Sequence, residues 1–274
     1  MFEKYIASDT DLKTIEQAAN IAFHPKMKFI FPTDMKTTLI ASYDSKFIYV
    51  WQINPAKLIL KLPHKFIIPD EWQSGWWANF ISSEMKNYLS KKINIDKKSI
   101  ISGGLLEPFI NLQKNKNIPL NPYTTPESYI ATIIHELGHV YWNQQKLWYF
   151  SSKKENLNYI KQAIDLYGFD SKSKTPKLTF KQPSPFWFSE VYAFCTEYCA
   201  STLFFSTHKN NLDKFIGKRL KKILKEEKSK DLQNKNSTID PNTNIHDLSF
   251  VLGKIVLSKY PQTWPTILKT VSQI

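Results

Sequence analysis

The residues of this sequence most able to do chemistry are five consecutive ones, His135-Glu136-Leu137-Gly138-His139. In an α-helix, side chains four residues apart point the same way, because successive residues turn by about 100°. His135 and His139 can therefore bind one metal ion together. Glu136 lies one step round the helix, where its carboxylate can take a proton from a water molecule on the metal. The spacing predicts a metal site with Glu136 as its general base.

A zinc site of this kind needs a third protein ligand, with water in the fourth position. The strongest candidate is Glu190, in the segment Pro185–Phe194. It follows His139 by 51 residues, which is enough chain for a helix, a loop and a return to the site. Two histidines further along, His208 and His246, are also available, and we expect His208 to be structural.

A helical wheel separates the roles on the segment that carries Glu190. Glu197 shares the face of Glu190 and lies two turns away, about 10 Å along the axis. We expect it to accept a histidine N–H behind the ligands, or to replace Glu190 as the ligand. Ala193 is small enough on the same face to let two helices approach. Cys195 and Cys199 fall on the opposite face, where thiols usually pack as small core residues.

The two motifs together resemble a known family. HELGH followed by Trp-Phe-Ser-Glu-Val-Tyr-Ala is similar to the zincin metallopeptidases of the gluzincin type. The resemblance implies zinc held by His135, His139 and Glu190, with Glu136 as the general base in peptide hydrolysis. Three departures leave the subfamily unidentified. Val191 stands where the family usually has glycine, the gap between the motifs is longer than in many members, and no exopeptidase motif stands out upstream.

The family also implies a second donor that stabilises the negative oxygen of the transition state. Related enzymes use a tyrosine or a histidine for this. The sequence offers Tyr192, Tyr198, His208 and His246 and does not choose among them. His246 is attractive because the carboxylate of Asp247 adjoins it.

The second half of the chain reads as helices that carry the site. Hydroxyl residues, an early proline and a glutamate at Thr124–Glu127 predict the start of a helix over 125–146. Ile133, Ile134, Leu137, Val140 and Trp142 give that helix a large apolar surface, which predicts burial. Further helices are expected at 155–167, 186–205, 212–224, 245–259 and 264–271, with a linker at 228–244.

The first half reads as a small sheet flanked by helices. A helix is expected at 9–23, and another after Asp70 with Trp76 and Trp77 on its apolar face. Strands are expected at 29–31, 37–43, 46–52, 57–62 and 105–112, the second and third as a hairpin. The expected fold is therefore α+β and zincin-like, in one domain over 1–274. Its sheet lies in 1–124, packed on the motif helix, and its zinc site lies in 125–274.

Composition restricts the alternatives. The chain has 274 residues, 42% of them hydrophobic, which is enough for a real core. A net charge of +13 suggests an acidic partner such as nucleic acid or an anionic membrane. However, Arg219 is the only arginine, and lysine lacks the guanidinium fork that reads bases. We therefore expect a peptide or protein substrate and no specific nucleic acid.

Two alternatives to a zinc peptidase stay open at this stage. The first is a catalytically inactive zincin that acts as a protein-binding or sensor module. The second is a basic protein that binds nucleic acid or a membrane surface, in which HELGH is incidental. With two cysteines in a chain of this length, we expect a fold that does not depend on disulfide bonds. We also expect no secretory signal and no membrane span, because no apolar run suits either. The expected localisation is cytoplasmic, and the oligomeric state is left open.

Overall fold

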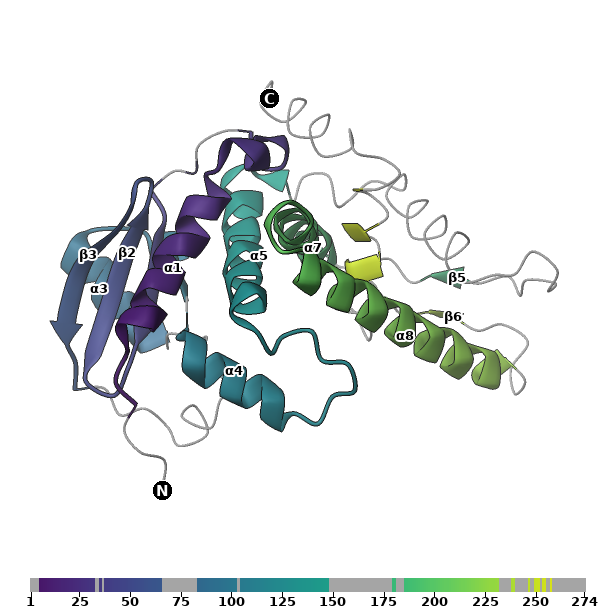
Figure 1. Cartoon of the computed structure of the whole chain (residues 1–274). Coiled ribbons are helices and arrows are strands. Elements are labelled where there is room, and N and C mark those ends of the chain that lie inside the picture. The colour runs from purple at the N-terminus through teal and green to yellow at the C-terminus, as the bar shows by residue number, and fades with distance from the viewer. Residues whose placement is uncertain are drawn as a thin grey trace.

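The fold is α+β, with a four-stranded mixed sheet in the N-terminal part and a mostly helical C-terminal part (Figure 1). This confirms the expected fold class. The computed structural model describes residues 5–32, 35, 37–65, 83–102, 104–147, 179–180, 185–231, 238–239, 246, 249–251, 253, 254 and 257. The predicted helices at 155–167 and 264–271, the start of the helix expected after Asp70 and the Trp76-Trp77 pair lie outside these residues.

The sheet has the strand order β3-β2-β1-β4. Its strands are β1 (Leu39–Tyr43), β2 (Phe47–Ile53), β3 (Ala56–Pro63) and β4 (Ile100–Ser102). β1 and β2 form the predicted antiparallel hairpin, and β3 extends it antiparallel to β2. β4 pairs with β1 in parallel and was not expected from the sequence. Three residues are too few for their alternation to be recognised as a strand.

Both faces of the sheet are covered, which explains why every residue of β1 is buried. Side chains alternate between the faces of a strand. Ile40 contributes to the main core, which includes residues of α1 (Asp9–Ala22). Leu39 and Ala41 belong to a second core with Met85 and Leu89 of α3 (Ser83–Ile93). The sheet is therefore a central layer that presents one face to the helices of the site.

Two predicted strands are wrong. Residues 29–31 form the end of the short 3₁₀ helix η1 (Pro25–Phe29) and the residues that follow it. Pro25 starts this helix, and the His24 ring caps it by accepting from the Lys26 backbone N–H. Residues 105–112 fall mainly in α4 (Leu106–Asn115), where Leu106 and Phe109 are buried at helical spacing. Pro108 lies in the first turn of α4, where a proline costs no hydrogen bond, whereas a strand interior would lose one.

The motif helix is α5 (Pro126–Gln144), which confirms the helix predicted over 125–146. Its N-cap is Thr125, and the capping box is completed by Ser128 rather than by the expected glutamate. The five apolar residues expected to bury this helix are all buried: Ile133, Ile134, Leu137, Val140 and Trp142. In Figure 1, α5 runs between the layer of α1 and the helix α7 (Pro185–Phe204).

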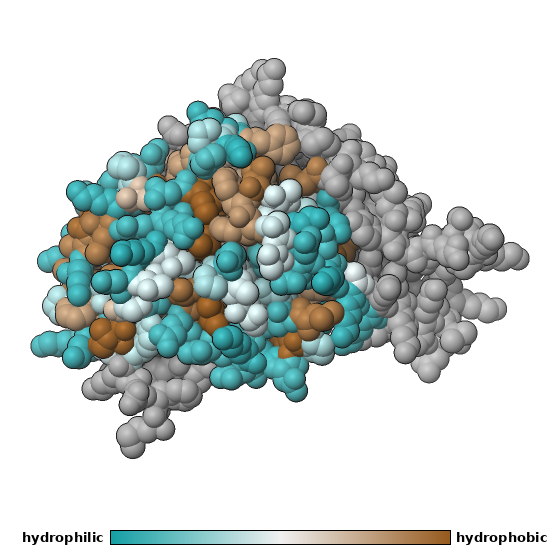
Figure 2. All heavy atoms as spheres, in the orientation of Figure 1, coloured by the Kyte–Doolittle hydropathy of each residue, from teal (hydrophilic) through white to brown (hydrophobic). Residues whose placement is uncertain are grey.

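The helix α7 is buried nearly all round from Phe188 to Thr196, as a central helix should be. The chain then breaks at Phe205 and continues as α8 (Ser206–Asp231), which is longer than the predicted helix at 212–224 and runs into the expected linker. A short parallel pair joins β5 (Thr179–Phe180) to β6 (Thr238–Ile239). On the face seen in Figure 2, hydrophilic residues predominate and hydrophobic ones form separate groups among them.

Candidate metal centre

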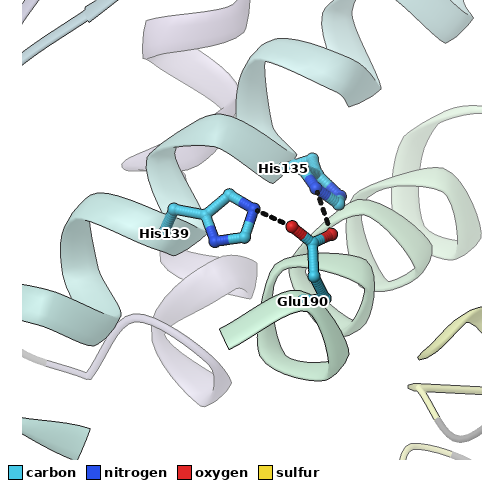
Figure 3. Close-up of side chains that lie close together, drawn as sticks. All are labelled: His135, His139 and Glu190. Carbon is cyan, nitrogen blue, oxygen red and sulfur yellow. Dashed lines mark ion pairs between the residues drawn. The ribbon is translucent and has the colours of Figure 1, made fainter. Parts of the chain in front are cut away.

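His135, His139 and Glu190 lie together and can hold a metal ion. The structure brings His135 and His139 from α5 and Glu190 from α7 to one point (Figure 3). His139 Nε2 lies 3.3 Å from Glu190 Oε1, and His135 Nε2 lies 3.6 Å from Glu190 Oε2. Two atoms bound to one ion at about 2.0–2.2 Å are roughly 3 to 3.5 Å apart. The two measured distances are close to this spacing, and one possible ligand atom from each of the three side chains lies within 4.8 Å of the other two.

Close contact between α5 and α7 makes this meeting possible. Gly138 lies between the two histidines and faces α7, where a Cβ atom would stand 2.9 Å from Ala193 Cα and 2.7 Å from Thr196 Oγ1. The Thr196 hydroxyl donates to the carbonyl oxygen of Ile134, which ties the two backbones together. A glycine and an alanine at the crossing let the histidines of one helix reach the glutamate of the other.

Each histidine has a polar contact on the side away from Glu190. His139 Nδ1 lies 2.7 Å from the hydroxyl oxygen of Ser189. His135 Nδ1 lies 3.2 Å from Glu197 Oε2, so the buried Glu197 carboxylate stands behind that ring. Such contacts fix which ring nitrogen carries the proton and which is left to bind a metal. In both rings the Nε2 atom faces Glu190.

The electrostatics of the metal-free centre are those of a cation between two carboxylates. Burial lowers the pKa of His135, but Glu190 and Glu197 outweigh this and raise it to about 10. Burial acts to raise the pKa of Glu190 as well, yet the three surrounding histidines hold it well below its usual range. The pKa of Glu197 is also lowered, by His135 and His208, against the effect of burial. The site is therefore built to hold a positive charge at the position of His135.

The donor set fits a divalent metal, and buried polar atoms without partners support this. Among the described residues, His135 Nδ1, Glu190 Oε2, Glu197 Oε1 and both ring nitrogens of His208 are buried without an aligned hydrogen-bond partner. Such atoms are costly in a protein interior unless something compensates them. An ion held by two imidazoles and a carboxylate, the set that zinc accepts, would partner Glu190 Oε2 and hold His135 in place.

Glu136 follows His135 on α5 and is half-buried. Its carboxylate acts on Lys86 of α3, a partly buried cation. Burial lowers the pKa of Lys86, and the negative charge of Glu136 acts in the opposite direction.

The four side chains considered as donors to the transition state differ in their contacts and in their exposure. The Tyr192 hydroxyl donates to the Ile30 carbonyl in the core, and the Tyr198 hydroxyl donates to Asp213. His208 is buried against Glu197. His246 is the exposed one: 64% of its side chain is accessible, and its Nδ1 lies 3.5 Å from Glu190 Oε2.

Sequence reasoning missed Ser189 and did not foresee how His208 contributes to the centre. Ser189 directly precedes Glu190, and this adjacency to a proposed ligand is the sequence feature that could have indicated its role. His208 was expected to be structural; it lies in the first turn of α8, and its side chain is fully buried beside Glu197. The break between α7 and α8 at Phe205 has no glycine or proline to mark it. The two cysteines behave as expected: Cys195 is buried and Cys199 mostly so.

Comparisons with protein family models, with curated proteins and with solved structures found no match. In the part of the chain that the structure describes, no helix combines the length and the apolar character that crossing a membrane requires.

Proposed function

We propose that the protein is a zinc-dependent peptidase, with His135, His139 and Glu190 as the metal ligands. The observation that carries the proposal is the meeting of the two imidazole Nε2 atoms with one carboxylate, at 3.3 and 3.6 Å, in a largely buried site. The order of a sheet followed by helices, with HELGH on a buried helix, supports the resemblance to gluzincins. A bound zinc ion supplies a water molecule acidic enough to deprotonate near neutral pH and polarises the substrate carbonyl.

Glu136 is the general base of the proposed reaction. Its carboxylate accepts the proton of the attacking water and passes it to the nitrogen of the leaving amine. The half-buried position of Glu136, one step from His135 on α5, supports this role.

His246 is the candidate donor to the oxygen that becomes negative when water attacks. Its exposed ring can reach a substrate, and its approach to Glu190 brings it to the edge of the ligand set. A donor placed at such an oxygen is worth about a hundredfold to a thousandfold in rate. The other three candidates make contacts in the interior.

The test is hydrolysis of a mixed peptide library by the zinc-loaded protein. We expect cleavage that a chelator abolishes, that zinc restores and that Glu136→Gln lowers by about a hundredfold to ten-thousandfold. Glu127→Gln is the matched control, because Glu127 is an exposed glutamate on the same helix. A folded, zinc-loaded wild-type protein that cleaves no peptide would exclude the enzyme and favour a binding module.

A further inference from the structure

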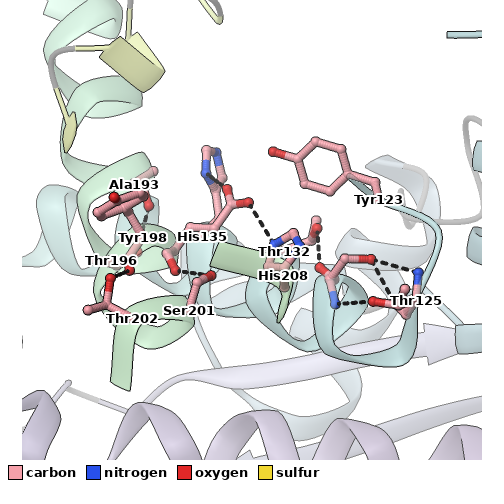
Figure 4. Close-up of polar contacts among 12 residues, drawn as sticks. Tyr123, Thr125, Thr132, His135, Ala193, Thr196, Tyr198, Ser201, Thr202 and His208 are labelled. Carbon is pink, nitrogen blue, oxygen red and sulfur yellow. Dashed lines mark hydrogen bonds and ion pairs between the residues drawn. The ribbon is translucent and has the colours of Figure 1, made fainter. Parts of the chain in front are cut away.

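Three helices contribute one side chain each to a buried polar chain that runs away from the proposed ligands. It starts at His135 on α5, passes to Glu197 on α7 and ends at His208 on α8. His135 Nδ1 lies 3.2 Å from Glu197 Oε2, and Glu197 Oε1 lies 3.7 Å from His208 Nε2. The two oxygens of one carboxylate thus face two different imidazole rings. Figure 4 labels His135 and His208, the two histidines at the ends of this chain.

Burying these polar side chains is unfavourable unless they interact with one another. The side chains of Glu197 and His208 are 2% and 0% exposed. A carboxylate in such surroundings is strongly unfavourable unless it is paired, and an aliphatic residue would fill the same space at less cost. Aromatic packing also holds the far end, since the Tyr123 ring lies edge-on to His208 at 5.9 Å between centroids.

At its His135 end, the chain of contacts meets Nδ1, the ring atom whose protonation decides how His135 can bind a metal. A neutral imidazole carries its proton on one nitrogen and a lone pair on the other. For Nε2, which faces Glu190, to offer its lone pair, the proton must be on Nδ1. A carboxylate oxygen 3.2 Å from Nδ1 favours the form with the proton on that atom.

We propose that Glu197 and His208 are a positioning pair: His208 holds the Glu197 carboxylate, which in turn orients His135 and sets how tightly the centre binds its metal. His208 is placed to act only through Glu197, because its Nε2 meets the carboxylate oxygen that His135 does not use. The inference rests on the metal-binding part of the proposed function and is independent of peptidase activity.

The experiment measures zinc affinity by competition with a chromophoric chelator, using the full chain. His208→Leu removes the imidazole beside Glu197, and His208→Gln keeps an amide N–H near the position of Nε2. We expect His208→Leu to weaken zinc binding by about tenfold to a hundredfold, and His208→Gln to recover most of that loss. His64→Leu, which removes a histidine beside the sheet, is the control and should leave the affinity unchanged.

A double-mutant cycle tests whether His208 acts through Glu197. In a Glu197→Gln background we expect His208→Leu to cost little further affinity, because the group it positions is already altered. Absorption spectra of the cobalt-substituted variants give a second readout, since they report the coordination geometry. Additive losses, or equal losses for His208→Leu and His208→Gln, would overturn the positioning role and leave a packing role. Failure of the wild-type protein to bind zinc would instead overturn the metal centre itself.

Discussion

Gly138 of α5 lies against Thr196 of α7 so closely that a Cβ atom on the glycine would stand 2.7 Å from the threonine hydroxyl oxygen. Ala193 is equally close, at 2.9 Å from its Cα. Because Gly138 stands between the two proposed histidine ligands and Ala193 is one turn from Glu190, this crossing sets the distance between the two halves of the ligand set. The glycine of HELGH therefore has a structural reason of its own in this chain.

Gly138→Ala should consequently push the two helices apart. We expect it to destabilise the protein by about 1–3 kcal/mol, the usual cost of overpacking, and to weaken zinc binding. Gly217→Ala on α8 is the matched control, because a Cβ there meets nothing within 4 Å. That change should be neutral or stabilising by about 0.5–1 kcal/mol. Thermal unfolding and chelator competition measure both effects, and equal behaviour of the two variants would contradict the proposed crossing.

Ser189→Ala removes the hydroxyl that lies 2.7 Å from His139 Nδ1. We expect zinc affinity to fall by about tenfold to a hundredfold, because a hydrogen-bond partner that orients a metal ligand contributes this much. Thr202 lies on the same helix and is exposed, and its hydroxyl donates to the backbone carbonyl oxygen of Tyr198 one turn earlier. Thr202→Ala should therefore keep the wild-type affinity. If Ser189→Ala binds zinc as tightly as this control, Ser189 does not position His139.

The metal-free protein should lose stability as the pH rises. The pKa of His135 is about 10 in the folded chain and 6.5 when unperturbed. Its protonated form therefore stabilises the fold fully below pH 6.5, and this stability is lost as the pH rises toward 10. The lowered pKa values of Glu190 and Glu197 add stability that is lost only in acid, so they do not offset this decline.

Zinc should remove that alkaline decline, because the ion takes the place of the proton between the carboxylates. Melting temperatures of metal-free and zinc-loaded protein between pH 6 and 10 measure the difference. Binding near neutral pH should also release a proton, which calorimetry in buffers of different ionisation enthalpy detects. A metal-free protein whose melting temperature is flat over this range would contradict the raised pKa of His135.

His246→Gln tests the proposed donor to the transition state. Its side chain is 64% exposed, so the change should leave folding and zinc content intact. We expect kcat to fall by about a hundredfold to a thousandfold with little change in KM, because the contact forms only as charge develops. A loss of zinc together with activity would instead make His246 part of metal binding, and unchanged turnover would exclude the donor role.

The sequence predicted well where one element carries its own pattern. The helix 125–146 was recognisable from its cap and its apolar stripe, and the hairpin of β1 and β2 from two adjacent runs of strand-forming residues at 37–43 and 46–52. The α+β fold class follows from these elements. The meeting of Glu190 with the histidines was also anticipated, from the helical wheel and from a resemblance rather than from any contact that a sequence displays.

Other features depend on tertiary structure, and the sequence did not reveal them. The short strand β4 exists because β1 offers it an edge, and the apolar run at 105–112 became α4 because its proline suits a helix start. An Asp11 oxygen also accepts from the backbone N–H of Glu107 in the first turn of α4, a contact made across 96 residues. His208 lies at the centre because the chain breaks between α7 and α8 at Phe205. No glycine or proline marks this break in the sequence, so it was not predicted. The single-domain organisation and the role of each site residue remain predictions.

The central claim is that two histidines of α5 and one glutamate of α7 hold one metal ion. Metal analysis of the purified full chain after zinc loading and extensive dialysis tests it most directly, with Glu190→Gln beside Glu127→Gln as its control. The account predicts one zinc per chain in the wild type and in the control, and its loss from Glu190→Gln. A wild-type protein that retains no stoichiometric metal, or a Glu190→Gln variant that keeps it as tightly, would contradict the account.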